Sequence, residues 1–492
     1  MSVPVGGGAA TSPAAVDVAG WGWRHAGRRA WALRGLDLRI EPGERVLLLG
    51  PSGSGKSTLL AGLAGLLDPD AGEVEGAIRL DGRDIRSART TRARTGLVMQ
   101  DTEAAIVMNR AGDDVAFGLE NRGVPAGEIW ARVDEALAAV GFPGGRDTPT
   151  AALSGGEQQR LVIAGILALR PGLLLLDEVT ANLDPAGAAL VRSLIERVLD
   201  TTRATCVLVE HRVDDVVDLV DRAVVLEPGG GVVADGAPAE VFGRQGAELA
   251  ARGVWVPGRL PVVRRTALEP AGPPLVRARG VRLRYPAATR DALPPTNLTL
   301  RSGEAVAVTG PNGAGKSSLA LVMAGLIRPT AGTVDAVGPL AAQQPGKPLW
   351  RWPGRELARS VGTVFQDPEH QFVRTTVRAE LALGPRLTGS DAATATARAE
   401  ELMERLGLTA LAEANPFTLS GGEKRRLSVA TAIATAPTVV IADEPTFGQD
   451  ALTWAALAEL LADLRDNGAA LALVTHDRAL VEAVADRELA LP

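Results

Sequence analysis

Short aliphatic runs recur along the chain, and each ends in glycine or in a pair of carboxylates. Residues 46–50 read VLLLG and residues 306–310 read VAVTG, while residues 173–178 read LLLLDE and residues 439–444 read VVIADE. Strands that are buried on both faces of a parallel sheet have such nearly unbroken apolar runs, whereas strands with one wet face alternate. A loop and a helix are expected after each of the first two runs, so the pattern predicts an α/β fold.

The same phrases occur twice at a nearly constant distance. The offset is 316 − 56 = 260 between the lysines of two glycine-rich loops and 419 − 153 = 266 between the leucines of two LSGGE phrases. It is 443 − 177 = 266 between two aspartates and 476 − 211 = 265 between two histidines. A repeat at this spacing indicates a duplicated domain. The 492 residues are too many for one core and suit two domains of roughly 230 residues.

The domain boundaries follow from where the periodic pattern is lost. We expect a flexible tail over residues 1–15, which has neither the basic region nor the apolar region of a signal peptide. The domains are predicted over residues 16–250 and 274–492. Proline, glycine and arginine replace the pattern over residues 251–273, which we interpret as a short linker.

Composition narrows the classes of partner. The net charge is 52 − 58 = −6 and the sequence pI is about 5.5, so we expect no nucleic-acid partner. The one cysteine, Cys206, lies in an apolar run and is interpreted as core packing, which excludes a disulfide framework and fits a reducing cytosol. The most apolar stretch, residues 161–178, is interrupted by Arg170, Pro171 and Gly172 and is not expected to span a bilayer.

Both glycine-rich loops match the phosphate-binding pattern G-x-x-x-x-G-K-[ST]. Glycines let backbone N–H groups converge on phosphate oxygens, the lysine neutralises the β and γ phosphates, and the serine hydroxyl reaches magnesium. A glycine-rich capping turn is the alternative, but two matches in the same strand-loop-helix setting argue against it. The predicted nucleotide-binding residues are Gly50, Pro51, Ser52, Gly53, Ser54, Gly55, Lys56, Ser57 and Thr58, and Gly310, Pro311, Asn312, Gly313, Ala314, Gly315, Lys316, Ser317 and Ser318.

Paired carboxylates end the second type of apolar run. Asp177 and Asp443 are predicted magnesium ligands, and Glu178 and Glu444 are placed to accept a proton from an attacking water. A solvated sheet edge is the alternative. The pair recurs at a similar distance from its lysine, 177 − 56 = 121 and 443 − 316 = 127, which favours the catalytic interpretation.

Two of the four histidines end apolar runs at matching positions. His211 lies 211 − 178 = 33 residues after its glutamate and His476 lies 476 − 444 = 32 residues after its own. An imidazole there could hydrogen-bond a γ-phosphate, although a lone histidine is usually structural. His25 and His370 have no such pairing, and ligation of a metal by histidine is not expected.

The LSGGE phrases at 153–157 and 419–423 place a serine and two glycines ahead of a predicted helix. Exposed N–H groups and the dipole at a helix start favour an anion. Each half already has a phosphate-binding loop, so we expect a head-to-tail pairing in which the LSGGE phrase of each half closes over the nucleotide of the other.

The set of motifs resembles the nucleotide-binding domain of ATP-binding cassette (ABC) proteins over nearly all of both halves. The resemblance implies two P-loop NTPase domains in tandem, each with a RecA-like core, an antiparallel β subdomain and a helical subdomain, and ATP and Mg²⁺ as cofactors. It implies that the first site uses Trp23 at adenine, Gln100 with Ser57 and Asp177 at magnesium, Glu178 as base, His211 at the γ-phosphate, and Ser420, Gly421, Gly422 and Glu423 as the closing segment. For the second site it implies Tyr285, Gln366, Ser317, Asp443, Glu444 and His476, closed by Ser154, Gly155, Gly156 and Glu157, with Asp184 and Asp450 connecting the two sites.

The chain departs from the commonest family pattern at a few positions. Glu157 and Glu423 stand where glutamine is usual, Trp23 replaces a tyrosine, and Val179 occupies the position that Pro445 has in the second half. No charged group of the chemistry is lost, so we expect two hydrolysing sites. A tandem cassette with one degenerate site is the alternative.

The stretches after the two glutamines, residues 100–118 and 366–384, resemble those of energy-coupling factor ATPases, which drive vitamin and metal-ion importers. The resemblance implies an ATPase at the cytoplasmic face of the membrane that binds an integral T component, which holds a substrate-binding S component. Alternatives are a sugar or peptide importer and a soluble tandem-cassette ribosome factor. The latter should have a long charged linker, which residues 251–273 do not provide.

Overall fold

The computed structural model describes residues 12–86, 94–99, 104–181, 183–264, 271–286, 288 and 290–492. The chain divides into two compact units, Met1–Arg259 and Leu260–Pro492. Each unit is an α/β domain with one mainly parallel core sheet and one antiparallel sheet, as the sequence predicted.

The core sheet of the first unit has the order β10-β9-β3-β8-β7-β6. Its strands are β3 (Arg45–Leu49), β6 (Thr95–Val98), β7 (Leu173–Asp177), β8 (Thr205–Val209), β9 (Arg222–Leu226) and β10 (Val232–Gly236). Strands β6, β7, β8, β3 and β9 run parallel, and β10 pairs antiparallel with β9. The carboxyl ends of the parallel strands therefore meet at one edge, where ligands bind in such sheets.

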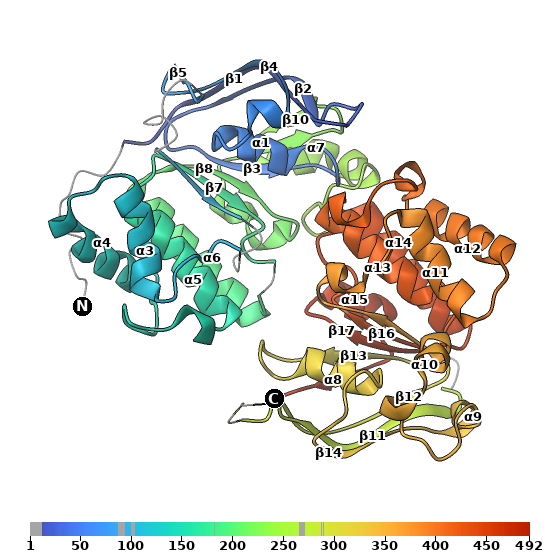
Figure 1. Cartoon of the computed structure of the whole chain (residues 1–492). Coiled ribbons are helices and arrows are strands. Elements are labelled where there is room, and N and C mark those ends of the chain that lie inside the picture. The colour runs from blue at the N-terminus through green and yellow to red at the C-terminus, as the bar shows by residue number, and fades with distance from the viewer. Residues whose placement is uncertain are drawn as a thin grey trace. The chain divides into compact units, whose positions relative to one another are not determined.

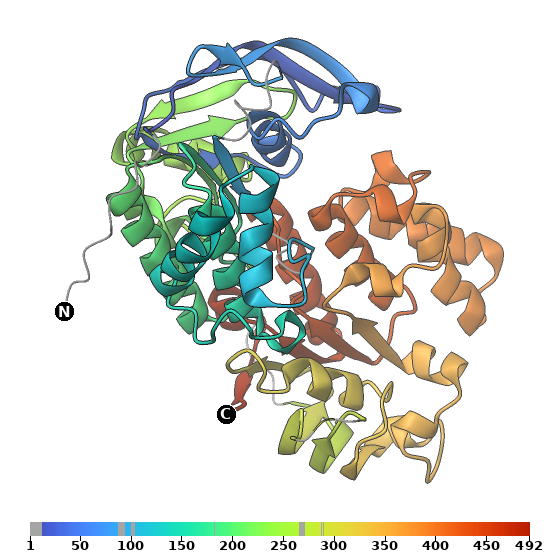
Figure 2. The same cartoon turned by 60° about the vertical axis from the view of Figure 1, so that its left-hand side comes forward.

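An antiparallel sheet of order β2-β1-β4-β5 covers one side of this unit. Its strands are β1 (Val16–His25), β2 (Leu33–Ile40), β4 (Gly72–Leu80) and β5 (Arg83–Asp84). Figures 1 and 2 show α1 (Lys56–Leu63) between the two sheets, and residues of both sheets and of α1 form one apolar cluster. Successive side chains of β3 point to opposite faces, so Val46 and Leu48 join this cluster while Leu47 and Leu49 join a second one.

The second apolar cluster of the first unit lies between the other face of the core sheet and the remaining helices. These are α3 (Ala111–Asn121), α4 (Ala126–Ala139), α5 (Gly155–Ala168), α6 (Pro185–Thr202) and α7 (Pro238–Ala251). Helices α3, α4 and α5 pack on one another and form the helical subdomain (Figure 1).

The second unit repeats this plan. Its parallel core sheet has the order β15-β16-β17-β13-β18, and its antiparallel sheet has the order β12-β11-β14. The core strands are β13 (Ala305–Thr309), β15 (Val361–Val364), β16 (Val439–Asp443), β17 (Ala470–Val474) and β18 (Arg487–Ala490). The antiparallel strands are β11 (Pro274–Leu283), β12 (Leu293–Arg301) and β14 (Ala331–Ala336). The predicted strands at 306–310 and 439–444 are thus confirmed as buried parallel strands.

The helices of the second unit are α8 (Lys316–Met323), α9 (Gly338–Ala341), α10 (Gly354–Ser360), α11 (Val377–Thr388), α12 (Ala392–Arg405), α13 (Gly421–Ile433), α14 (Ala451–Asp466) and α15 (Arg478–Val484). Helices α11, α12 and α13 form its helical subdomain (Figure 1). In the part of the chain that the structure describes, no helix combines the length and the apolarity needed to cross a membrane.

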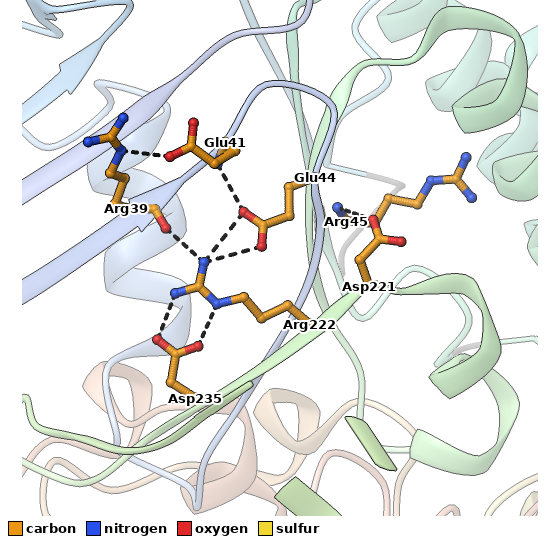
Figure 3. A network of polar contacts seen from close by, with 7 residues as sticks. All are labelled: Arg39, Glu41, Glu44, Arg45, Asp221, Arg222 and Asp235. Carbon is orange, nitrogen blue, oxygen red and sulfur yellow. Dashed lines mark hydrogen bonds and ion pairs between the residues drawn. The ribbon is translucent and has the colours of Figure 1, made fainter. Parts of the chain in front are cut away.

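A partly exposed arginine cluster fixes the start of the strand that leads to the phosphate-binding loop. In the first unit Arg222 of β9 donates to the carbonyl of Arg39 and to the carboxylates of Glu44 and Asp235 (Figure 3). Asp221 accepts the backbone N–H of Arg45 at 3.0 Å.

The second unit has the same crosslink at the corresponding positions. Arg487 donates to Glu304 at 2.6 Å and to the carbonyl of Thr299, and Asp486 accepts the backbone N–H of Ala305 at 2.8 Å. The crosslink ties three strands together at the end of the sheet where β3 and β13 begin.

Candidate nucleotide-binding sites

Close approaches of neighbouring atoms require glycine at the last position of each loop. A Cβ on Gly55 would come 2.5 Å from Leu33 Cγ, and one on Gly315 would come 2.3 Å from the carbonyl oxygen of Ala292. Gly55 and Gly315 have φ angles of 88° and 94° and precede α1 and α8. In the described structure no side chain caps either helix, so backbone N–H groups at the helix start face the loop and suit an anion.

The loop lysines are held above this turn by backbone carbonyls. Lys56 Nζ donates to the carbonyls of Gly50 and Pro51 at 2.7 and 3.1 Å. Lys316 Nζ donates to Gly310 and Pro311, each at 2.9 Å. Both ammonium groups therefore have the same placement, close to where phosphate oxygens would bind.

Oxygen ligands suited to magnesium converge at the ends of β7 and β16. Asp177 accepts a hydrogen bond from Ser57, and Asp443 accepts one from Ser317. Ser317 Oγ also lies 3.5 Å from Gln366 Oε1. Gln100, the predicted counterpart of Gln366, lies outside the described residues.

These residues fit a magnesium ion that is bound together with phosphates. Burial, with the charge of Glu178 added, raises the pKa of Asp177 to about 6, and burial also raises the pKa of Asp443. A divalent cation would favour the charged form of both carboxylates. Among the described residues no group of three or more histidine, cysteine, aspartate or glutamate side chains could form a metal cage. Magnesium usually takes only one or two carboxylates and completes its shell with phosphates and water.

In the first unit, the predicted base and the predicted γ-phosphate histidine contact each other. His211 Nε2 lies 2.8 Å from Glu178 Oε1, and both side chains are largely buried. Burial lowers the pKa of His211, but the charge and hydrogen bond of Glu178 outweigh this and raise it. Burial raises the pKa of Glu178, but His211 outweighs this and lowers it. The two side chains thus form an ion pair at the end of β7 and β8.

In the second unit, the same two side chains have other partners. Glu444 Oε1 accepts the backbone N–H of His476 at 3.0 Å, and Glu444 Oε2 accepts the hydroxyl of Thr475 at 2.9 Å. His476 Nε2 lies 3.1 Å from Asn312 Oδ1 in the phosphate-binding loop. Burial, with Asp443 and Asp477 adding to it, raises the pKa of Glu444 to about 7.

Both LSGGE phrases begin a helix through the same capping box. Ser154 N donates to Glu157 Oε2 at 2.8 Å ahead of α5, and Ser420 N donates to Glu423 Oε2 at 2.7 Å ahead of α13. Glutamate or glutamine at the third helical position is the usual partner in this motif. Glutamate can therefore fill a position where the family commonly has glutamine, because both side chains supply an acceptor oxygen to the capping box.

The two aspartates that follow the turns after Glu178 and Glu444 also cap helices. Asp184 accepts the backbone N–H of Gly187 at 2.7 Å at the start of α6, and Asp450 accepts that of Thr453 at 2.8 Å at the start of α14. Their predicted role between the two sites remains a prediction.

Comparison with known proteins decides the family. The sequence profile described as ABC transporter matches residues 33–181 and 293–447, which is one match in each unit. The chain belongs to the ABC transporter family. The ATP-binding proteins of this family are ATPases. YkoD of Bacillus subtilis (strain 168), named as a proposed HMP/thiamine import ATP-binding protein, is 33% identical over 484 residues, covering 93% of this chain and 86% of YkoD.

Two further ABC proteins are similar over nearly the whole chain. A protein of Bifidobacterium longum (strain NCC 2705), named as a proposed ABC transporter ATP-binding protein, is 36% identical over 499 residues, which are 94% of this chain. The chain spans only 63% of that relative's length. The solved structure of RNase-L Inhibitor superposes with a TM-score of 0.61 over 95% of this chain and 87% of its own, at 21% identity, and shares the tandem fold.

The structure corrects the predicted adenine contact of the first ABC domain. Trp23 is only 3% exposed and packs inside the unit, so its ring cannot lie flat against a bound base. Its Nε1 donates to Nδ1 of His25 at 3.2 Å. His25 is exposed, and its Nε2 lies 3.5 Å from Thr58 Oγ1.

His25 occupies the position that Tyr285 has in the second domain. Tyr285 is 40% exposed, and its hydroxyl lies 3.3 Å from Ser318 Oγ. The offsets 285 − 25 = 260 and 318 − 58 = 260 equal the offset between the loop lysines. The resemblance to the family placed Trp23 where a tyrosine is usual. The distance to the lysine, 56 − 25 = 31 and 316 − 285 = 31, is the signal that points to His25.

Proposed function

We propose that this ABC protein binds and hydrolyses ATP to power a membrane importer of the energy-coupling factor kind, with a vitamin or a transition-metal ion as cargo. It would lie at the cytoplasmic face of the membrane and bind an integral T component, which holds the substrate-binding S component. The similarity to YkoD, whose name proposes HMP/thiamine import, supports an import role.

The observation that carries the proposal is a pair of exposed valines after the two glutamines. Val107 is 58% exposed and Val373 is 67% exposed, and they occupy corresponding positions, since 373 − 107 = 266. Two large apolar side chains presented at the same place in both domains fit a surface that receives an apolar partner.

A carboxylate from the following helix binds the backbone of the loop that carries each valine. Asp114 Oδ1 accepts the backbone N–H groups of Val107 and Met108 at 2.8 and 2.9 Å. Glu380 Oε2 accepts those of Val373 and Arg374 at 2.9 and 2.7 Å. Asp114 and Glu380 are the acidic residues of the stretches that resemble energy-coupling ATPases. In each domain this residue fixes the loop that carries the exposed valine.

The second domain presents further apolar surface beside this loop. Phe372 packs edge-on against Phe417 with ring centroids 6.0 Å apart, and Phe417 is 47% exposed. An amphipathic helix from a membrane partner could cover Val373 and Phe417 with its apolar face. We assign this surface and its counterpart around Val107 to the two coupling segments of the T component.

We further propose that the two domains form a pseudo-dimer with two nucleotide sites, each closed by the LSGGE phrase of the other domain. A Cβ on Gly155 or on Gly421 would meet no described atom within 4 Å, so packing does not require glycine there. A close approach by a phosphate would require glycine at these positions. Bound magnesium would orient the phosphates and offset their charge. Lys56 and Lys316 would bind the β and γ phosphates, and Glu178 and Glu444 would accept the proton of the attacking water.

Copurification from detergent tests the membrane role. The chain expressed in a host that carries its genomic neighbours should copurify with a small integral membrane protein. The double variant Val107→Asp and Val373→Asp should lose it while it still binds ATP. Leu190→Asp and Leu452→Asp, at side chains that are 60% and 52% exposed, are the matched control and should retain the partner. Copurification of ribosomes, or of no membrane protein at all, would contradict the proposal.

A further inference from the structure

A buried carboxylate beside the first site has no role in the chemistry proposed above. Glu210 is 4% exposed and immediately precedes His211. Its Oε1 accepts the backbone N–H of Thr180 at 3.1 Å and the hydroxyl of Thr180 at 2.9 Å. Thr180 is itself 6% exposed and lies two residues after Glu178. One carboxylate oxygen thus satisfies both donors of a single buried residue.

The turn between Glu178 and Thr180 needs such support because its backbone is strained. Glu178 has a φ of 49°, and Glu444 in the second domain has a φ of 48°. Residues with a side chain avoid this left-handed region, and they persist there only when surrounding contacts determine the conformation. Since the same backbone position aims the carboxylate of the glutamate, whatever holds the turn also sets where the base points.

The second domain holds its turn by a carboxylate from the opposite side of the histidine. Asp477, one residue after His476, accepts the hydroxyl of Thr446 at 2.9 Å and the indole N–H of Trp454 at 2.5 Å. Thr446 occupies the position of Thr180, since each lies two residues after its glutamate. The two domains therefore reach the same threonine with carboxylates from different sequence positions.

The two glutamates proposed as bases, Glu178 and Glu444, also have different partners in the two domains. In the second domain the position before the histidine is Thr475, and its hydroxyl donates to Glu444. In the first domain Glu210 fills that position, and Glu178 instead pairs with His211.

The position after the first histidine is Arg212, which takes the place of Asp477. Its guanidinium is half exposed and pairs with Asp215 at 3.0 Å, away from the catalytic turn. The residues around the two histidines, EHR at 210–212 and THD at 475–477, therefore differ together: each set supplies one carboxylate to the threonine of its own domain.

We propose that Glu210 is a positioning residue of the first site. By accepting both donors of Thr180 it holds the strained turn that aims Glu178, and so does in the first domain what Asp477 does in the second. The inference rests on the proposed role of Glu178 as the base.

The test compares ATP hydrolysis by the full chain carrying Glu210→Ala or Glu210→Gln with that of the wild type, and uses Glu178→Gln to set the scale. Glu210→Ala leaves Thr180 without its acceptor. The kcat should therefore fall by about tenfold, toward the value of Glu178→Gln, while the KM for ATP stays unchanged. Glu210→Gln keeps an acceptor oxygen and should stay within about threefold of the wild type.

A double-mutant cycle separates positioning from general stability. Thr180→Val removes the hydroxyl and should lower kcat in part, and its effect should largely vanish in the background of Glu210→Ala. The inference would be overturned, and the proposed base kept, if Glu210→Ala had the kcat of the wild type while Glu178→Gln was slow. The same holds if the KM of Glu210→Ala rose by as large a factor as its kcat fell. A melting temperature that falls while kcat holds, or a Glu210→Gln as slow as Glu210→Ala, would overturn it as well. A wild-type rate for Glu178→Gln would refute the proposed base and this inference with it.

Discussion

Replacing Glu444 by glutamine should stabilise the second domain at alkaline pH. The carboxylate is buried at the end of β16, and burial together with Asp443 and Asp477 raises its pKa from 4.5 to about 7. The difference, 7 − 4.5 = 2.5, corresponds to about 3 kcal/mol. This is the order of the free energy by which the charged side chain destabilises the folded domain once it is ionised.

The sign of the pH dependence follows from proton binding. Between pH 4.5 and about 7 the folded domain keeps the proton of Glu444 while the unfolded chain has lost it, so the free energy of unfolding falls as the pH rises through this window. Glutamine is neutral at every pH, can accept from the N–H of His476 and can donate to Thr475. Glu444→Gln should therefore exceed the wild type in stability at pH 8 and match it near pH 5.

Calorimetry of the chain without nucleotide or magnesium measures the effect. For a domain of this size, about 3 kcal/mol raises the melting temperature by about 6 to 12 °C. Glu178→Gln is the matched control with the opposite sign. The pKa of Glu178 is held low by His211, so its charge stabilises the fold above its unfolded pKa for as long as His211 is protonated, and the variant should melt lower than the wild type at pH 6.

Two outcomes would refute this reasoning. One is a lower melting temperature for Glu444→Gln than for the wild type at pH 8. The other is a gain of equal size at pH 5 and pH 8, which would mean that the stabilisation does not come from removing a buried charge.

Three further outcomes are expected. Glu178→Gln combined with Glu444→Gln should bind ATP, measured by equilibrium dialysis, but lose about 10² to 10⁴ in hydrolysis rate, and wild-type turnover would contradict both base assignments. His25→Ala and Tyr285→Ala should each weaken binding of a fluorescent ATP analogue at one site, whereas Trp23→Phe, which removes only a hydrogen bond to His25, should weaken it less; the reverse order would restore Trp23 to the site. Glu157→Ala should lower the stability of the first domain by about 1 kcal/mol in thermal unfolding, and Glu157→Gln by less, because glutamine keeps an acceptor for the capping box.

Local sequence patterns were sufficient to predict the fold and the places where its motifs lie. The apolar runs at 46–50 and 173–178 are buried parallel strands, and the constant offset between motifs is a duplicated α/β domain. These features depend on periodicity and on turn chemistry within a few residues, so one sequence contains them.

Features that depend on contacts between distant residues could not be predicted in the same way. The pairing of Glu210 with Thr180 joins residues that follow two neighbouring strands, 30 positions apart, and His211 and His476 have different partners. The resemblance assigned Trp23 to adenine, although the strand register buries it, since it pairs with Leu33 on the inner face of the antiparallel sheet. Register, and not residue type, decides which side chain faces the loop.

The head-to-tail pairing of the two domains is the central claim, and disulfide crosslinking tests it most directly. Cys206 is buried and can be replaced by alanine to give a chain free of cysteine. In that background, cysteines at Ser57 and Ser420 should crosslink under oxidation when ATP is bound to a Glu178→Gln variant that cannot hydrolyse it. Cysteines at Ser57 and Ser154 should not. Efficient crosslinking of Ser57 to Ser154, with none to Ser420 under any nucleotide condition, would contradict the account.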